Sequence, residues 1–242
     1  MDEKLQQVFR VLRWSGAAMI VAASATYLVQ SCDEVGDVSR YLTLLGMTAL
    51  LPGVAYVCGI RLREGRSARV LVLTFLALIP VHAAVLAGFL LSQFGDTGTS
   101  VASVAQWVAP SRGAALLLVA GAGLVLIPLC WAAFRVLARR DARALTACSA
   151  AAHGLLLIPD RGVLSAAMTV LASLALATGC ALRFKPETVE ARLAVSSLAA
   201  PALLIAGRQL LFYEASSAFW GMLLSAGALA LFVLGKSLRD VT

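Results

Sequence analysis

The sequence predicts an all-α membrane protein, a polytopic bundle of eight transmembrane helices joined by short loops. Eight mostly uncharged, apolar runs follow one another along the 242 residues with little between them. Hydrophobic residues make up 60% of the chain and charged residues 14%, and the mean hydropathy is +0.88. A soluble domain carries roughly 25% charged residues. The basic residues gather at alternate ends of the runs, which is typical of a chain that crosses a bilayer repeatedly.

The eight runs reach the length that a bilayer demands or come close to it. A spanning helix needs about 20 apolar residues, the fifth run is shorter than this, and the seventh contains Arg208. Both are kept as spans because removing either would place a set of basic residues on the wrong side of the membrane. The spans, predicted to form a single domain over residues 14–238, are 14–32, 41–60, 70–95, 113–134, 144–159, 162–182, 193–213 and 215–235.

The basic residues predict that both termini face the cytoplasm. All but four of the 20 lysines and arginines then lie on the cytoplasmic side, the exceptions being Arg40, Arg112, Arg161 and Arg208. The net charge of +7 reflects this topology and attraction to anionic lipid head groups, so no nucleic-acid partner is expected. We expect a multi-pass protein of a bacterial inner (cytoplasmic) membrane. Its expected partners are the lipid bilayer and either other membrane subunits or further copies of the chain.

Two segments outside the spans are expected to lie on membrane surfaces. In residues 1–13 apolar side chains recur at helical spacing opposite charged and amide side chains, which predicts an amphipathic helix along the inner leaflet. The only long loop follows the third span. Apolar residues from Val101 to Val108 again have helical spacing, and Trp107 would lie at head-group depth. This loop is interpreted as an ordered surface segment, with a lid over a cavity as the alternative.

Small residues and prolines within the spans predict how the helices pack. Small residues let helix backbones approach closely in lipid, and two ridges of them occur, at Ser165, Thr169, Ser173 and Ala177 in the sixth span and at Gly221 and Ser225 in the eighth. A proline removes one backbone hydrogen bond and kinks its helix. Such kinks, which are compatible with a central cavity, are expected at Pro52, Pro80, Pro128 and Pro201.

The two histidines are the leading candidates for a functional site. Ionisable groups at membrane depth suggest function, and His82 and His153 lie about 20 Å and 15 Å from the arginines that begin their spans, at 1.5 Å per residue. Two facing imidazoles could ligate haem iron or, with added ligands, a transition metal. Two ligands are too few for a closed zinc site, and no metal motif is recognisable. A proton path and structural hydrogen bonding are the alternatives.

The outer end of the seventh span holds a second polar group. Arg208 and Gln209 lie about five residues before Glu214. The arginine is expected to pair with a carboxylate such as Glu214, and the alternative is that it receives an anionic substrate or lipid head group at the mouth of the bundle. These three residues join His82 and His153 as a predicted substrate path or polar network.

The cysteines predict no disulfide within the chain. Four of the five lie within spans, and Cys32 stands alone on the outer side. The basic start, the apolar stretch and the sequence Val-Gln-Ser-Cys ending at Cys32 loosely resemble a lipoprotein signal, in which this cysteine would be lipidated. Gln30 fits that pattern poorly, so an uncleaved first helix is the preferred interpretation.

The pattern as a whole predicts a non-enzymatic membrane component. The sequence contains no phosphate-binding glycine motif, no arrangement for nucleophilic attack and no regularly spaced arginine series for voltage sensing. We expect a small permease or a sensory or scaffold subunit of a membrane complex. A permease predicts a cavity that reaches the midplane, whereas a scaffold predicts a filled interior. The alternative from another class is an intramembrane redox protein with His82 and His153 as haem or metal ligands.

Overall fold

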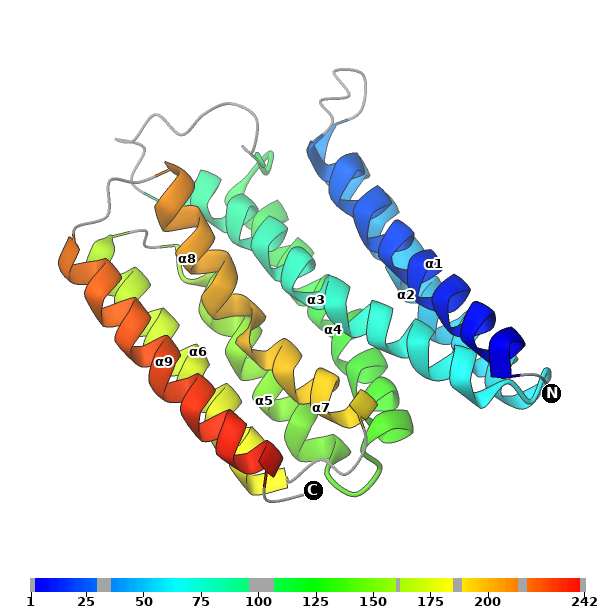
Figure 1. Cartoon of the computed structure of the whole chain (residues 1–242). Coiled ribbons are helices and arrows are strands. Elements are labelled where there is room, and N and C mark those ends of the chain that lie inside the picture. The colour runs from blue at the N-terminus through cyan, green and yellow to red at the C-terminus, as the bar shows by residue number, and fades with distance from the viewer. Residues whose placement is uncertain are drawn as a thin grey trace.

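The structure, a computed structural model, is helical throughout the part of the chain that it describes. It describes residues 3–29, 36–95, 107–159, 162–184, 189–212 and 217–239. The helices run up and down side by side (Figure 1). They are α1 (Glu3–Val29), α2 (Asp37–Ile60), α3 (Gly65–Phe94), α4 (Arg112–Leu137), α5 (Ala142–Gly154), α6 (Val163–Phe184), α7 (Val189–Ser196), α8 (Ala200–Phe212) and α9 (Ser217–Arg239). Two 3-10 turns, η2 (Leu155–Leu157) and η3 (Ser197–Ala199), follow α5 and α7.

The all-helical architecture and the membrane class agree with the prediction. Five helical stretches among the described residues are long and apolar enough to cross a bilayer: α2, α3, α4, α6 and residues Ala191–Gln209 of α7, η3 and α8. Shorter apolar stretches lie in α1 and α9, at Trp14–Ser24 and Phe219–Ala230. The fifth predicted span corresponds to α5 and η2, which are helical but are not among these seven stretches. The boundary predicted at residue 13 does not interrupt α1, which is continuous from Glu3.

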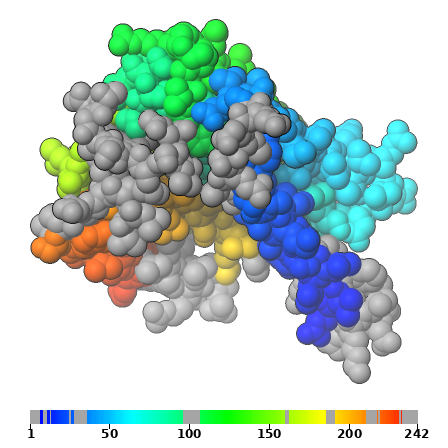
Figure 2. Space-filling model, turned by 90° about the horizontal axis from the view of Figure 1, so that it is seen from above, coloured from blue at the N-terminus to red at the C-terminus, as the bar shows by residue number. Residues whose placement is uncertain are grey.

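Helix α3 is the centre of the bundle. It contacts α1, α2, α4, α5, α7 and α8, and 67% of its apolar stretch is buried, compared with 17% for α2 and 22% for α4. Phe75, in its first half, and Phe89, in its last part, are fully buried. The other helices therefore each turn one face inward and leave another on the outside. Figure 2 shows α1 at the edge of the molecule, where its first half extends away from its neighbours.

The outer surface of the bundle is strongly apolar, as lipid requires. Large aliphatic side chains in the middle of several helices are mostly exposed, and the most exposed include Leu117, Leu124, Leu164 and Leu203, each with more than 70% of its surface free. A soluble monomer rarely exposes contiguous apolar patches of more than a few hundred Å². Exposing such a surface to water is unfavourable, whereas exposing it to the hydrocarbon of a lipid bilayer costs no free energy.

One of the two predicted small-residue ridges is an interface. In α6, Thr169, Ser173 and Ala177 are buried, and this helix packs against α8 and α9. The prediction for α9 was wrong, because Gly221 and Ser225 are both exposed. The helix turns its opposite side inward, where Phe219 is buried and stacks edge-on against Trp220.

Two helices break into 3-10 turns four residues before a proline. In an α-helix the carbonyl of Ser197 would accept from residue 201, but Pro201 has no N–H, and Ala200 donates to that carbonyl instead. Pro159 acts in the same way on Leu155, whose carbonyl accepts from Ile158 at 3.4 Å. The seventh span was predicted as one helix, but the missing N–H of Pro201 divides it into α7, η3 and α8. Pro52, Pro80 and Pro128 lie inside continuous helices.

Most of the exposed basic side chains among the described residues gather at one end of the bundle, and Arg112 is exposed at the other. The ends of α2, α4, α6 and α9 and the starts of α1, α3, α5 and α7 lie at the lower end in Figure 1. The exposed arginines at this end include Arg61, Arg63, Arg66, Arg69, Arg135, Arg139, Arg140, Arg143 and Arg183. The segregation by charge that the sequence predicts is therefore present in three dimensions.

The turn from α2 to α3 holds a residue in an unfavourable backbone conformation. Arg63 has φ of 53°, and Glu64 N–H donates to the carbonyl of Cys58 at 2.9 Å. A helix that ends with a residue in the left-handed conformation normally has glycine there, because a Cβ atom is strained in that conformation. Arg63 occupies the place of that glycine.

Replacing Arg63 with glycine should stabilise the protein. The left-handed conformation costs an L-residue about 1–2 kcal/mol, and glycine loses about 0.5–1 kcal/mol more chain entropy, so a gain of up to about 1 kcal/mol is expected. The free energy of unfolding in mixed detergent micelles measures it. The control is Arg61→Gly, at a residue with ordinary helical angles of −77° and −45°, which should destabilise. Equal effects of the two changes would contradict this explanation.

Candidate ligand cavity

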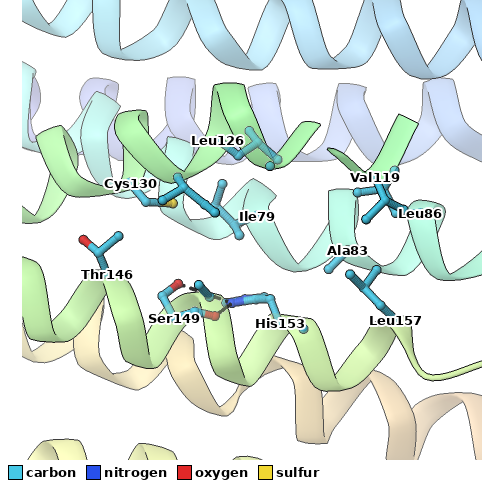
Figure 3. A pocket seen from close by; sticks show the side chains of 14 residues that line it. Ile79, Ala83, Leu86, Val119, Leu126, Cys130, Thr146, Ser149, His153 and Leu157 are labelled. Carbon is cyan, nitrogen blue, oxygen red and sulfur yellow. Dashed lines mark hydrogen bonds between the residues drawn. The ribbon is translucent and has the colours of Figure 1, made fainter. Parts of the chain in front are cut away.

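A cavity of about 320 Å³ lies between α3, α4 and the segment formed by α5 and η2. Its walls are apolar apart from Thr146, Ser149 and His153, which follow one another along α5 (Figure 3). Leu126 and Cys130 of α4 lie on the opposite wall. Ligand pockets are typically 300–1,000 Å³, mostly apolar and equipped with a few polar groups. The cavity therefore has the size and chemistry of a site for a small, mainly apolar molecule.

The sequence leaves this space because three helices turn small residues toward it. Ala83 of α3, Gly123 of α4 and Ala150 of α5 all line the cavity. A Cβ atom added to Gly123 would touch only the end of Ile127, at 3.9 Å. Ala83 and Gly123 lie near the middles of α3 and α4, so the cavity lies at the depth expected for the bilayer midplane.

The cavity is closed toward the centre of the bundle and open toward its outside. The wall formed by α3, with Ile79 and Ala83, is buried. At the other side Ile127 of α4 is 49% exposed and Ala150 of α5 is also exposed. The opening thus lies on the apolar outer surface between α4 and α5, and a molecule dissolved in lipid would reach it from the side.

His153 lines this cavity and has one ring nitrogen without a partner among the described residues. Its Nδ1 atom lies 2.7 Å from the carbonyl oxygen of Ser149, one turn earlier in α5. A carbonyl oxygen can only accept, so Nδ1 carries the hydrogen and donates it. The other ring nitrogen, Nε2, is buried and has no hydrogen-bond partner among the described residues. In a neutral imidazole with hydrogen on Nδ1, Nε2 carries a lone pair.

His82 belongs to a separate polar group between α2 and α3. Its ring is fully buried, its Nε2 atom lies 3.0 Å from the hydroxyl oxygen of Thr48, and Tyr41 packs edge-on against it with ring centroids 5.6 Å apart. His82 Nδ1 and the Tyr41 hydroxyl are buried without a hydrogen-bond partner in the part of the chain that the structure describes. His82 is not among the residues that line the cavity.

The structure does not bring the two histidines onto a shared ligand. Axial ligation of haem requires both imidazoles to converge on one iron, but Nε2 of His82 is directed at Thr48 on α2, whereas His153 lines the cavity between α4 and α5, which His82 does not line. Among the described residues no group of three or more histidines, cysteines, aspartates or glutamates is placed to hold a metal ion. The arrangement therefore favours two separate roles for His82 and His153.

The polar group predicted at the end of the seventh span lies in α8. Gln209 is fully buried there and Arg208 is partly buried. Neither lines the cavity. Glu214 and Cys32 lie outside the described residues, so the predicted pairing of Arg208 with Glu214 and the lipidation of Cys32 stay predictions.

The sequence did not reveal a polar clamp at the end of the bundle opposite the basic turns. Arg40 is 8% exposed, donates from Nη2 to the carbonyl of Tyr27 at 3.1 Å, and lies 3.6 Å from Asp37. Its guanidinium also covers the ring of Trp107, 5.0 Å from the centroid. The backbone N–H of Val108 donates to Asp37 at 3.0 Å. The clamp therefore ties α1, α2 and the segment before α4 together.

Trp107 is accordingly buried against protein on one side. Its side chain lies so close to Gly88 of α3 that an added Cβ atom would be 3.1 Å from it, and its ring packs edge-on against Phe89. The helix predicted across Val101 to Val108 is not present at 107–109, which are not helical, because Trp107 and Val108 are held by side chains of α2. The earlier part of that predicted helix lies outside the described residues.

Comparison with known proteins gives no relative: no family model, no curated protein and no solved structure matches this chain.

The hydrogen bond between Thr48 and His82 should couple α2 to α3 energetically. Interhelical hydrogen bonds in membrane proteins contribute about 0.6 kcal/mol on average and up to about 1.7. A double-mutant cycle of Thr48→Val and His82→Leu, measured as the free energy of unfolding in mixed micelles, should give a coupling energy in this range. Thr43→Val is the matched control, since Thr43 is exposed on the same helix and bonds its own helix backbone. Equal coupling for Thr43 and Thr48 would contradict the assignment.

Proposed function

We propose that the chain is an eight-span protein of a bacterial cytoplasmic membrane, with both termini in the cytoplasm, that acts as a small permease for lipophilic solutes. The observation that carries the function is the cavity beside α3, which lies at mid-depth, is open toward the apolar outer surface and is lined by His153. A scaffold would need no such space in its interior.

The proposed orientation rests on the exposed arginines. They lie at the end of the bundle that also holds the start of α1 and the end of α9, and basic residues near span ends stay in the cytoplasm. Eight crossings agree with this placement because an even number returns the chain to its first side. At the opposite end Arg40 is covered by Trp107 and accompanied by Asp37, and Arg112 is an exception to the charge bias, since it is exposed there beside the ring of Phe94.

The 3-10 turn η2, which ends the fifth predicted span, also supports a transport role. Leu157, the last residue of this 3-10 turn, lines the cavity. In transporters, non-helical backbone at membrane depth lines cavities, and one part of the bundle moves against another. The η2 turn therefore provides a position at which the cavity wall could move without unfolding α5.

The apolar opening indicates which solutes enter. The rim residues carry no charge, and a charged solute would have to leave its water shell to reach a cavity that offers it no counter-ion. A solute that already partitions into lipid meets no such barrier. We therefore propose lateral entry from the bilayer between α4 and α5.

Filling the cavity from α4 should abolish binding of an apolar probe. Apolar cavities of 150 Å³ bind benzene, so naphthalene should fit the larger space here. In lipid nanodiscs, naphthalene at about 100 times its Kd should stabilise the wild-type protein by about 2.7 kcal/mol, and Gly123→Leu should remove most of this effect by occupying the cavity. The measurement is thermal unfolding with and without the probe.

Gly121→Leu is the matched control for this experiment. Gly121 lies on the same helix, two residues away, and is exposed with nothing near its Cβ position. Both changes raise helix propensity and both add an apolar side chain, but only one enters the cavity. Stabilisation of all three proteins by naphthalene, or of none, would contradict the proposed binding site.

A further inference from the structure

We infer that the cavity receives one acyl chain of an anionic phospholipid, whose phosphate is held by the arginines of the turn between α4 and α5. This inference rests on the proposed function, because it names the class of lipophilic solute that enters the same cavity. It depends on the elongated shape of the cavity, on the position of Arg143 beyond one end of it, and on the shortage of carboxylates around that end.

The cavity is long and narrow. Its lining residues run along α4 from Val119 to Cys130 and along α5 and η2 from Thr146 to Leu157. At 1.5 Å per residue each of these stretches is about 16 Å long. Figure 3 shows Val119 and Leu157 at one end and Cys130 and Thr146 at the other. A volume of about 320 Å³ over that length gives a mean cross-section of about 20 Å², which leaves room for one extended hydrocarbon chain and not for two.

Arg143 lies beyond the end of the cavity that Thr146 marks. It comes three residues before Thr146 and seven before Ala150 on α5, and both of these line the cavity. Residues spaced by three, four or seven lie on one face of a helix, so Arg143 belongs to the face of α5 that borders the cavity and its opening. Arg139 and Arg140 lie in the turn that joins α4 to α5, and all three arginines are exposed. Because this turn connects the two helices that frame the opening, the three charges gather beyond the same end of the cavity.

The charge at this end complements an anionic head group. Asp141 is the one carboxylate between Arg139 and Arg143, and among the described residues it forms no ion pair with these arginines. No residue that lines the cavity is charged. A phosphate is therefore favourable at the turn, where guanidinium groups and water surround it, and unfavourable inside the cavity, where it would lose both. A phospholipid matches this arrangement, with its head group at the turn and one chain in the cavity.

An anionic lipid uses both parts of the site, whereas other solutes use one. A neutral hydrocarbon fills the cavity but gains nothing from the arginines. Free phosphate gains from the arginines but leaves the cavity empty. The arginine turn lies at the end of the bundle proposed to face the cytoplasm, and the cytoplasmic leaflet is the one that carries the anionic lipids. The lipid therefore comes from the inner leaflet, through the opening between α4 and α5.

A phospholipid with a photoreactive diazirine in the middle of one acyl chain tests whether the chain enters the cavity. Phosphatidylglycerol and phosphatidylcholine that carry this group are compared at equal concentration in nanodiscs of phosphatidylcholine, and mass spectrometry locates the labelled residues. Ile79 and Ala83 are each 6% exposed and line the cavity on α3, so the surrounding lipid reaches them through the cavity. Phosphatidylglycerol should label this pair more than phosphatidylcholine does, and an excess of naphthalene should prevent the labelling.

Two arginine variants distinguish this site from a general attraction to a basic surface. One arginine at the surface contributes about a 5-fold gain in affinity for anionic lipid, and Arg143→Gln should lower the preference for phosphatidylglycerol at Ile79 and Ala83 by this factor. Arg135→Gln is the matched control. Arg135 is exposed near the same end of α4, but its guanidinium lies over Trp131, 5.1 Å from the ring centroid, and neither residue lines the cavity. Its loss should leave the preference unchanged.

The outcomes separate the inference from the proposed function. Equal labelling of Ile79 and Ala83 by the two lipids, or a preference that falls equally with Arg143→Gln and Arg135→Gln, would overturn the role of the anionic head group. If neither lipid labels this pair although naphthalene binds as expected, entry of the acyl chain is wrong and the proposed function stands. If naphthalene stabilises the wild-type and Gly123→Leu proteins equally, the proposed function itself fails, and the inference fails with it.

Discussion

The burial of α3 is the constraint on which the rest of the structure depends. Since 67% of its apolar stretch is covered by protein, the surrounding helices must supply its neighbours and leave their own outer faces to lipid. Apolar burial alone does not drive helix association in lipid, so close contacts and polar bonds determine which faces meet. The buried ridge of α6, the bond from Thr48 to His82 and the clamp around Arg40 perform this role. The cavity lies where small residues on three helices leave the contact with α3 incomplete.

Most of the helical architecture could be predicted from the sequence because length and lack of charge are strong signals in a membrane protein. The break at η3 was missed because Pro201 was interpreted as a kink within one helix. The position of the freed carbonyl, four residues earlier at Ser197, would have located the break. Arg40 was missed for a different reason. A single arginine near a span end is expected at the interface, and only the fold shows that Asp37 and Trp107 cover it.

The expected depths of His82 and His153 could be derived from the sequence, but not the directions in which their side chains point. Counting residues placed His82 and His153 about one helical turn apart in depth, but successive side chains on a helix point about 100° apart, so depth does not say which neighbour a residue meets. Ala83 faces the cavity, whereas His82, one residue earlier, meets Thr48. The cavity forms because small residues of three helices lie at the same depth, and the sequence of any one helix does not predict it. The hydrogen bond to the backbone carbonyl of Ser149 fixes the ring hydrogen of His153 on Nδ1, and the sequence alone does not show this bond.

The central claim is that lipid surrounds this bundle and that its basic end faces the cytoplasm. Three single cysteines, placed before, within and after α4 in a chain without its own cysteines, test it most directly with a membrane-impermeant maleimide. Pro110→Cys should react in intact cells and Arg139→Cys only after the cytoplasmic side is opened, since both positions are exposed at opposite ends. Leu124→Cys should react in neither case, although Leu124 is 79% exposed in the fold. Rapid reaction at Leu124, or reaction of Arg139→Cys in intact cells, would contradict the account.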